Sequence, residues 1–212
     1  MIRLAFFDFS KTIAADSGFG AGPYLVGRKK EYDLLYEEFV SNKISEISFI
    51  KSVIKLWKGV REEDLPKIYS KIEINQNAKE ILKQLKSMNI KLALVSFIPT
   101  KLAELYKTFG FDYLSGTECE IINGVFTGEV LKINHDKGIT TKNISNILKI
   151  GMDECIAVGD SRGDIKMFKS VGYKNSFAYN AAEEAKKYAK YHIKNFKEIM
   201  HIIENDNKIK DI

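Results

Sequence analysis

Three polar side chains directly follow apolar runs of strand length. Asp8 ends the run over residues 2–8, Ser96 follows residues 90–95, and Asp160 follows the run that begins at Cys155. Because the carboxyl ends of parallel strands meet at one edge of a sheet, we expect the three side chains to converge on one crevice. Two carboxylates held close together repel each other unless a cation lies between them. Oxygen ligands of this kind suit Mg²⁺, so the sequence predicts a magnesium site at this edge.

Two further charged residues stand close to the expected crevice. Asp164 lies four residues beyond Asp160, one helical turn further, from where it could brace the site by hydrogen bonding. Lys137 lies at an expected helix start, where the helix dipole disfavours a cation. Such a lysine makes sense if it faces an anion, and a solvated surface lysine is the alternative. Ser96 and the helix start at Pro99 offer donors that suit phosphate oxygens.

Helices alternate with buried strands from residue 75 onward, which predicts an α/β fold with a Rossmann-like parallel sheet and helices on both faces. Asn123-Gly124 between apolar flanks predicts a two-residue hairpin turn. Asn75 is the expected cap of the first helix, and Gly151 is expected to close the helix that Lys137 opens. Helices are expected over 75–88, 99–108, 137–150, 163–170, 181–189 and 195–205, strands over 90–95, 155–158 and 174–178, and a frayed tail over 204–212.

Between the first strand and residue 75 the pattern is different. Residues 13–30 are glycine-rich and read as a loop, without the Gly-Lys-Ser/Thr of a nucleotide-binding loop. Apolar residues at helical spacing over 31–72 predict three short helices. We therefore expect a core domain over residues 1–15 and 75–212, with a small helical cap over residues 16–74 inserted after the first strand.

Composition excludes several classes of function. The chain has 212 residues, 45% of them hydrophobic, which suits one domain with an insertion. The net charge of +5 comes from lysines mixed with glutamates, without a block of like charge, so no nucleic-acid partner is expected. No apolar run is long enough for a membrane span, and no signal peptide is evident. Cys119 and Cys155 are expected to be buried thiols in a cytoplasmic protein, and three scattered histidines argue against zinc.

The ordered motifs resemble those of the haloacid dehalogenase superfamily, and the phosphoserine phosphatase-like branch in particular. The motifs are Asp8-Phe9-Ser10-Lys11-Thr12, Leu94-Val95-Ser96, Lys137 and Gly159-Asp160-Ser161-Arg162-Gly163-Asp164. The resemblance covers nearly the whole chain, and a helical insertion after the first motif is similar to that branch's cap. It implies a Mg²⁺-dependent phosphatase that acts on a small phosphorylated substrate, and it leaves the oligomeric state open.

The resemblance also implies a role for each site residue. Asp8 would attack phosphorus and form an aspartyl-phosphate, which splits one hard displacement into two easier ones. Thr12 would brace the loop. The metal would be held by Asp8, the backbone carbonyl of Ser10, Asp160 and, as a supporting carboxylate, Asp164. The phosphoryl oxygens would be held by Ser96, the backbone N–H of Phe97 and Lys137, so that the expected catalytic residues are Asp8, Ser10, Ser96 and Lys137.

Ser10 departs from the family pattern, because phosphatases of the family usually carry an aspartate there as general acid and base. Such catalysis is worth about 10²–10⁴-fold in rate, so we expect slow turnover. Three functions remain open: a phosphatase with undemanding leaving groups or another base, a phosphotransferase or long-lived phosphoaspartate, and a non-catalytic phosphate-binding protein. His135 is a candidate substitute base, and a surface histidine is the alternative.

The residues that bind phosphoserine in the branch are also replaced. A glutamate expected after the first motif falls at Ser17, beside Asp16, and a cap arginine falls near Val53. Phe97-Ile98 follow Ser96 where small glycines are usual. Phosphoserine is therefore not the expected substrate. A different substrate specificity could come from Arg28, Arg162, Tyr32, Tyr36 and Trp57. For each of them, an ordinary surface or core role is the alternative.

Overall fold

The computed structural model describes residues 1–133 and 136–210, and within them it has one seven-stranded sheet in the order β4-β3-β2-β1-β5-β6-β7. Neighbouring strands are parallel except for β3 and β4, which form an antiparallel hairpin around Asn123-Gly124. The predicted α/β fold and hairpin are confirmed. The strands are β1 Leu4–Phe7, β2 Lys91–Pro99, β3 Tyr113–Ile122, β4 Val125–Lys132, β5 Cys155–Gly159, β6 Ser176–Tyr179 and β7 Tyr191–Ile193.

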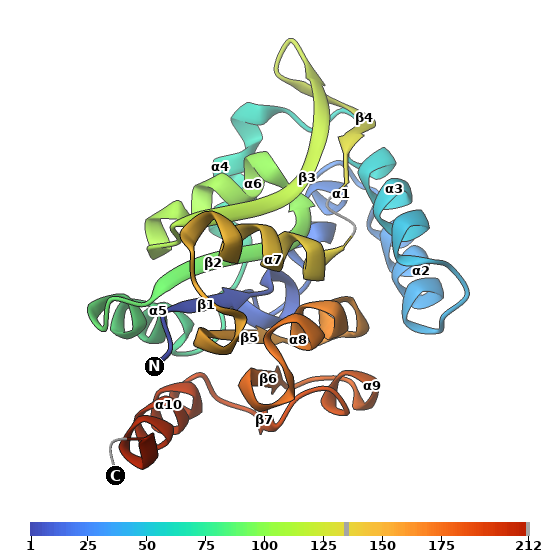
Figure 1. Ribbon diagram of the computed structural model, residues 1–212. Helices are drawn as coiled ribbons and strands as arrows, with labels where there is room; N and C mark the ends of the chain where they lie inside the picture. Colours follow the sequence, from blue (N-terminus) through green and yellow to red (C-terminus); the bar gives the residue numbers. More distant parts are fainter. Residues whose placement is uncertain (134–135, 211–212) are drawn as a thin grey trace.

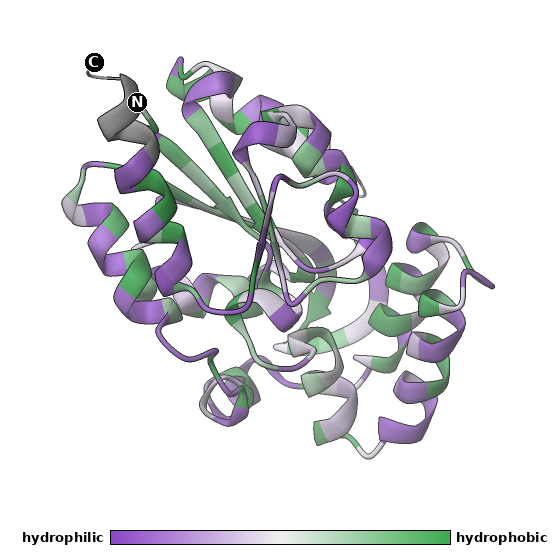
Figure 2. Ribbon diagram, turned by 90° about the horizontal axis from the view of Figure 1, so that it is seen from below, coloured by the Kyte–Doolittle hydropathy of each residue, from purple (hydrophilic) through white to green (hydrophobic). Residues whose placement is uncertain are grey.

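Helices cover both faces of this sheet, as Figure 1 shows. One face carries α5, α6 and α10, and the other carries α7, α8 and α9. Figure 2 shows largely hydrophobic strands between helices in which hydrophilic and hydrophobic residues are mixed. The helices are α1 Ala21–Leu25, α2 Lys29–Val40, α3 Glu46–Leu56, α4 Leu65–Lys71, α5 Ala78–Ser87, α6 Thr100–Glu104, α7 Lys137–Leu148, α8 Ile165–Val171, α9 Glu183–Lys186 and α10 Lys197–Lys210.

The first strand lies at the centre of the sheet and is covered on both faces. Ala5 and Phe7 belong to the core beneath α5 and α10, while Leu4 and Phe6 belong to the core beneath α7 and α8. All four side chains are fully buried, and full burial of a leucine or phenylalanine side chain contributes about 1.5–3 kcal/mol. This explains why the sequence shows a continuous apolar run instead of alternation. It also fixes rigidly the point at which Asp8 leaves the strand.

Residues 16–74 contain the helices α1 to α4, of which the last three were predicted. The loop expected over residues 13–30 is partly wrong, because residues 21–25 form α1. The glycines there serve close packing: a Cβ at Gly18, Gly20 or Gly22 would lie within 2.8 Å of an aromatic ring. These rings are Phe9, Tyr32 and Trp57 respectively.

The strand β4 supports this helical segment from the sheet side. The backbone N–H of Phe126 donates to Val60, and the N–H of Gly59 donates to Phe126. The Trp57 ring packs on Phe126, with the ring centroids 5.3 Å apart. The helices α2 and α3 lie side by side beyond the ends of the strands (Figure 1). The β3–β4 hairpin therefore connects the sheet to α3, a contact that the sequence does not indicate.

Several predicted element ends are wrong for local reasons. Asn75 does not cap α5, because its side chain donates to the carbonyls of Thr12 and Ala14, 2.7 and 3.2 Å away; Asn77 is the cap residue. The helix α7 ends before Gly151, at Lys149, whose φ is 54°. The strand β2 does not stop before Ser96 but continues to Pro99, with an irregular register in between.

The C-terminal part differs most from expectation. The strand β7 was missed because three residues are too few to show a period. The tail was expected to fray from residue 204, but α10 continues to Lys210. The start of this helix is held by Phe196, which lies against Phe7 and Tyr179, and Ile199 and Ile203 are also buried. None of the helices described here is long and apolar enough to cross a membrane.

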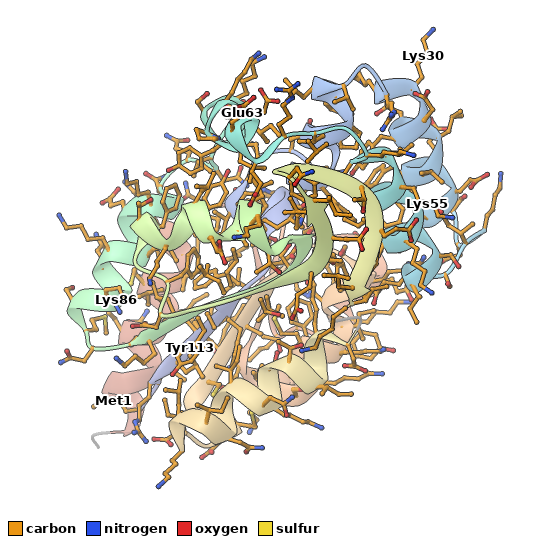
Figure 3. The ribbon with its side chains drawn as sticks, turned by 90° about the horizontal axis from the view of Figure 1, so that it is seen from above. Met1, Lys30, Lys55, Glu63, Lys86 and Tyr113 are labelled. Carbon is orange, nitrogen blue, oxygen red and sulfur yellow. The ribbon has the colours of Figure 1, made fainter. Side chains whose placement is uncertain are left out.

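The surface is rich in lysine, as expected from the composition. Figure 3 shows Lys30 and Lys55 at the periphery of the molecule, and both are exposed. Other lysines form surface ion pairs with acidic neighbours, for example Lys86 with Asp112 at 2.7 Å. The two thiols are free; Cys155 is buried and Cys119 is half-buried.

Candidate active site

A cavity of about 290 Å³ lies at the carboxyl ends of β1, β2 and β5. Asp8 enters it directly after β1, Ser96 from within β2, and Asp160 directly after β5. Ser10 and Lys137 also line its wall. The structure therefore brings together the three strand-end residues that the sequence places at one edge of the sheet.

The backbone after β1 aims Asp8 into the cavity. The Asp8 N–H donates to the carbonyl of Val158 at 3.0 Å, which continues the strand ladder by one residue. The chain then makes a single turn, closed by the Ala14 N–H on the Phe9 carbonyl. Inside this turn Ser10 is extended, and Lys11 adopts a left-handed conformation with φ 57°. A non-glycine residue in that region costs about 1–3 kcal/mol and persists where its surroundings hold it in place, commonly at functional sites.

A buried cluster of charges forms the floor of the cavity. The Lys137 ammonium donates to Oδ1 of Asp8 at 2.5 Å and to Oδ1 of Asp164 at 2.7 Å. The other oxygen of Asp164 accepts from the backbone N–H groups of Asp160 and Ser161, both at 3.0 Å. Asp164 thus braces the loop after β5 and orients Lys137. The sequence suggested this bracing role from spacing alone.

Lys137 occupies the first turn of α7, where its positive charge would be unfavourable without nearby anions. Only 2% of the residue is exposed. Burial lowers the pKa of this ammonium, but the Asp164 and Asp8 carboxylates outweigh burial and hold the pKa above its ordinary value. The helix start is held by Asp136, which accepts from the Ile139 N–H at 3.0 Å. Lys137 is therefore a fixed, charged group inside the site and not a solvated surface lysine.

Asp8, Asp160 and Asp164 each offer a carboxylate oxygen, and these three oxygens lie within 4.8 Å of one another. Burial raises the pKa of Asp8 to about 6, against the lowering effect of Lys137. Burial, followed by the charges of Asp164 and Asp8, raises the pKa of Asp160 well above its usual range. Three carboxylates against one ammonium leave two negative charges, which fits one divalent cation bound by oxygen ligands. Thr12 Oγ1 lies 3.5 Å from Asp160 Oδ1 and supports this carboxylate.

The opposite side of the floor is formed by the end of β2. Ser96 is 3% exposed, and its hydroxyl accepts from the Ile98 N–H at 3.4 Å. The Phe97 ring lines the cavity, with the Lys137 ammonium 4.8 Å from its centre. The place of Ser96 at this crevice agrees with the expectation from the sequence. The Ser96 hydroxyl and the Lys137 ammonium line the same cavity as Asp8, and such donors can hold a phosphate dianion beside it.

The roof of the cavity comes from the helical segment. Of the residues proposed to set specificity, Tyr32, Tyr36 and Arg162 line the cavity. Arg28 and Trp57 do not: Arg28 donates to the carbonyls of Leu56 and Lys58, and Trp57 is fully buried with its Nε1 donating to Phe19. His135, the suggested substitute base, lies outside the described residues.

Two cations tie the floor to the roof, and sequence reasoning missed one of them. The Lys11 ammonium donates to the Tyr36 hydroxyl at 2.6 Å and lies 4.5 Å from that ring's centre. The Arg162 guanidinium lies 4.2 Å from the centre of the Phe39 ring, and it donates to Asn42 and to the Ile44 carbonyl. Cation–π contacts of this kind contribute about 0.5–2 kcal/mol. No sequence period reports them, because the partners are 25 or more residues apart.

Glu46, the first residue of α3, is another functional candidate that the sequence did not single out. Its Oε2 lies 3.3 Å from the position that a Cβ on Gly163 would take. Burial raises the pKa of this carboxyl, while Lys137 and Lys166 lower it. In the sequence Glu46 reads as an ordinary acid in a first helical turn after the Ser45 cap.

Several known proteins have sequences similar to that of this chain. A family model described as haloacid dehalogenase-like hydrolase matches residues 121–203, which include Lys137, Asp160 and Asp164. A phosphoserine phosphatase of Methanocaldococcus jannaschii is 28% identical over 180 residues, covering 82% of this chain and 85% of the relative. These matches confirm the resemblance to the haloacid dehalogenase superfamily, and to its phosphoserine phosphatase-like branch, that the motifs indicated.

Other members of the superfamily agree with this assignment. A phosphoserine phosphatase of Archaeoglobus fulgidus is 29% identical over 191 residues, which is 87% of this chain and 54% of that protein. The chain therefore spans about half the length of this relative. A relative of the same name from Campylobacter jejuni subsp. doylei is 23% identical and covered over its whole length. The hydrolase family and these relatives support the expectation of a phosphatase-type enzyme.

Solved structures establish that the fold is that of haloacid dehalogenase-like phosphatases. A substrate-bound phosphoserine phosphatase superposes with a TM-score of 0.85 at 23% identity, covering 95% of this chain and 98% of that one. A phospho-aspartyl intermediate analogue of phosphoserine phosphatase gives a TM-score of 0.84 at 24% identity, with the same coverage. The similarity at this identity concerns the fold, so the chemistry must be argued from the residues present here.

Proposed function

We propose that this chain is a Mg²⁺-dependent phosphatase of small phosphomonoesters, working through an aspartyl-phosphate on Asp8. The observation that carries the proposal is the floor of the cavity: a buried Asp8, 2.5 Å from a buried Lys137, in a cluster of three carboxylates. The named activity of the relatives supports a small phosphorylated substrate. Residues 16–74 would act as a cap over a core formed by residues 1–15 and 75–212.

Asp8 would perform the first chemical step. One of its carboxylate oxygens attacks phosphorus, and the bond from phosphorus to the leaving-group oxygen breaks, so that the leaving oxygen keeps the electron pair. Lys137 would screen the charge of Asp8 and contact a phosphoryl oxygen, and Ser96 Oγ with the Phe97 N–H would donate to the others. Mg²⁺, held by Asp8, the Ser10 carbonyl, Asp160 and the supporting Asp164, would neutralise the charge that separates a carboxylate from a phosphate dianion.

Ser10 would limit the rate of both steps. A serine hydroxyl cannot protonate a leaving alkoxide near neutral pH, and it cannot remove a proton from the water that breaks the aspartyl-phosphate. Both protons must then move through solvent. We therefore expect slow hydrolysis, with phosphorylated Asp8 accumulating when the leaving group is good.

Phosphoserine would not be the preferred substrate. The position of the expected glutamate is Ser17, whose hydroxyl is bonded to the Tyr32 hydroxyl. The position of the expected arginine falls near Val53, which is fully buried in the apolar core. Neither position offers a charge to the ammonium or the carboxylate of an amino acid.

Incubation with Mg²⁺ and an activated aryl phosphate tests the proposal against its alternatives. Steady turnover that Asp8→Asn abolishes supports a phosphatase. A burst followed by near-zero turnover, with phosphate retained on Asp8, supports a phosphotransferase or a stored phosphoaspartate, which Ser10 favours. Binding of phosphate without a burst and without labelling would refute the enzymatic role and leave a phosphate-binding protein.

A further inference from the structure

The cavity has two ends of different chemistry. The floor is charged, whereas the roof is built from apolar and aromatic side chains of the helical segment. The roof residues are Phe19, Tyr32, Tyr36, Phe39, Val40 and Phe49. Among the described residues from 16 to 74 that line the cavity, none carries a charge.

The cations nearest the roof already have partners. Lys11 is bonded to the Tyr36 hydroxyl, and Arg162 is held by Asn42, the Ile44 carbonyl and the Phe39 ring. Burying a charged group without a partner is strongly unfavourable. Among the described residues, the helical segment places no charged side chain on the cavity wall, so a leaving group with an ammonium and a carboxylate would gain no ion pair from the roof, which therefore favours an uncharged group.

The roof rings are held in a fixed arrangement. Phe39 and Phe49 stack with centroids 4.5 Å apart and planes 13° apart, and Tyr32 stacks on Tyr36 at 6.2 Å. A Cβ on Gly20 would lie 2.8 Å from the Tyr32 ring, so only glycine allows that ring its position. Aromatic pairs favour stacked or edge-to-face arrangements at such distances. A preformed set of rings on a cavity wall is suited to one further ring.

The volume of the cavity is also consistent with one aromatic ring as part of the ligand. Its volume of about 290 Å³ lies at the lower limit for ligand sites, which run from about 300 to 1,000 Å³. A phosphate with one small ring suits this space, and a large leaving group does not.

Ser10 points to the same class of substrate by an independent route. Without a general acid, the leaving oxygen must depart unprotonated. Phenols ionise at a pKa of about 10, far below the values of alcohols, so a phenolate leaves more readily than an alkoxide. In such a reaction Asp8 Oδ bonds to phosphorus, the aryl oxygen leaves with the electron pair, and it takes a proton from water. A second water then attacks the phosphorus, restoring the Asp8 carboxylate and releasing inorganic phosphate.

We propose that the site selects aryl phosphomonoesters, with the phosphate at Asp8 and an uncharged ring beneath α2 and α3. Turnover of an aryl phosphate rests on the proposed function. Binding of its ring by Tyr36, Phe39 and Phe49 does not. These residues would thus be determinants of substrate class, supplied by the helical segment.

Kinetics with three phosphates test this proposal. Phenyl phosphate should give a higher kcat/KM than phosphoserine, and Phe39→Leu or Tyr36→Leu should raise the KM for phenyl phosphate about two- to tenfold, the range expected for one lost aromatic contact. Acetyl phosphate has a good leaving group but no ring, so its KM should not change. Leu34→Ala is the matched control, because Leu34 is on α2 but 63% exposed and away from the cavity wall. An equal change in the KM for phenyl phosphate and for acetyl phosphate would overturn the proposal.

A binding measurement separates this proposal from the proposed function. With Mg²⁺ present, the wild-type protein should bind phenylphosphonate about tenfold or more tightly than methylphosphonate in calorimetry. This preference without turnover of any phosphate would support the ring site and refute the phosphatase. Turnover with equal binding of the two phosphonates would refute the ring site and leave the phosphatase standing. The comparison uses the wild-type chain, so it stays decisive if a roof variant fails to fold.

Discussion

Ser10→Asp is the most informative single change, because it restores a titratable group two residues beyond Asp8. Ser10 lines the cavity, and its backbone, with φ −65° and ψ 129°, accepts aspartate without strain. The new carboxylate would reach the side of the cavity where a leaving oxygen departs. It also adds a negative charge close to Asp8 and Asp160, so the assay must be run at saturating Mg²⁺, which offsets the repulsion.

The expected gain follows from the size of general acid–base catalysis. A positioned acid or base contributes about 10²–10⁴-fold, which corresponds to about 3–5 kcal/mol of activation free energy. The gain should be greatest for alkyl phosphates, whose leaving oxygen needs a proton. It should be much smaller for the formation of the aspartyl-phosphate from phenyl phosphate. Hydrolysis of the aspartyl-phosphate should accelerate with every substrate, because the same aspartate activates water.

Stopped-flow and steady-state kinetics of wild type, Ser10→Asp and Ser10→Asn provide the measurement. Asparagine matches the shape of aspartate but cannot exchange a proton, so only Ser10→Asp should gain. The reasoning is refuted if a folded Ser10→Asp variant with bound Mg²⁺ is no faster than wild type on alkyl phosphates, or if Ser10→Asn gains equally.

Three other predictions concern the metal, the roof and the fold. Mg²⁺ at about 100 times its Kd should stabilise the chain by about 2.7 kcal/mol; a thermal-shift assay should show this as a Tm rise that a chelator reverses and Asp160→Asn abolishes. No Mg²⁺-dependent shift in wild type would contradict the metal site. Arg162→Gln should lower the free energy of unfolding in urea by about 1–2 kcal/mol and raise KM, and unchanged values of both would contradict its contacts with Asn42 and Phe39. Burial raises the pKa of the Asp112 carboxyl, but hydrogen bonds from Lys86 and the Leu92 N–H outweigh burial and lower this pKa in the folded state. The ionised carboxylate therefore stabilises the folded chain above an unfolded pKa of about 4. This stabilisation is lost as the pH falls through the lower pKa of the folded state. Asp112→Asn should cost about 1–2 kcal/mol at pH 7 and nothing near pH 2, and an equal cost at both pH values would refute the assignment.

The positions of the floor residues were predictable because they follow from backbone topology. Asp8 and Asp160 directly follow buried parallel strands, Ser96 lies three residues before the end of a third strand, and the carboxyl ends of such strands meet at one edge of the sheet. Lys137 was identifiable as unusual because a cation opposes the dipole of its helix. The place of each of these residues depends on a single helix or strand, and a sequence pattern describes a single element best.

The roof was not predictable in the same way. Helical spacing indicates that Phe39 faces inward, but it cannot tell a core contact from a cavity wall. Trp57 has the same pattern and is fully buried beneath Phe126 instead. Whether an inward ring meets a cavity depends on the neighbours that the fold supplies from distant segments.

Errors at element ends have a related cause. Asn75 has the residue type of a helix cap, yet its side chain holds the turn after β1, some 60 residues earlier in the chain. Lys149 ends α7 in a left-handed conformation, ahead of the glycine that would be the usual choice. At Asn75 a tertiary contact overrides the local preference, and at Lys149 the helix closes on its own last turn.

Trapping of phosphate on Asp8 tests the central claim most directly. The protein is incubated with Mg²⁺ and phenyl phosphate, quenched in acid during the burst, digested and analysed by mass spectrometry. The account predicts one added phosphoryl group on the peptide containing Asp8, absent from Asp8→Asn and shorter-lived in Ser10→Asp. Turnover that persists in Asp8→Asn, or a phosphoryl group found on another residue, would contradict it.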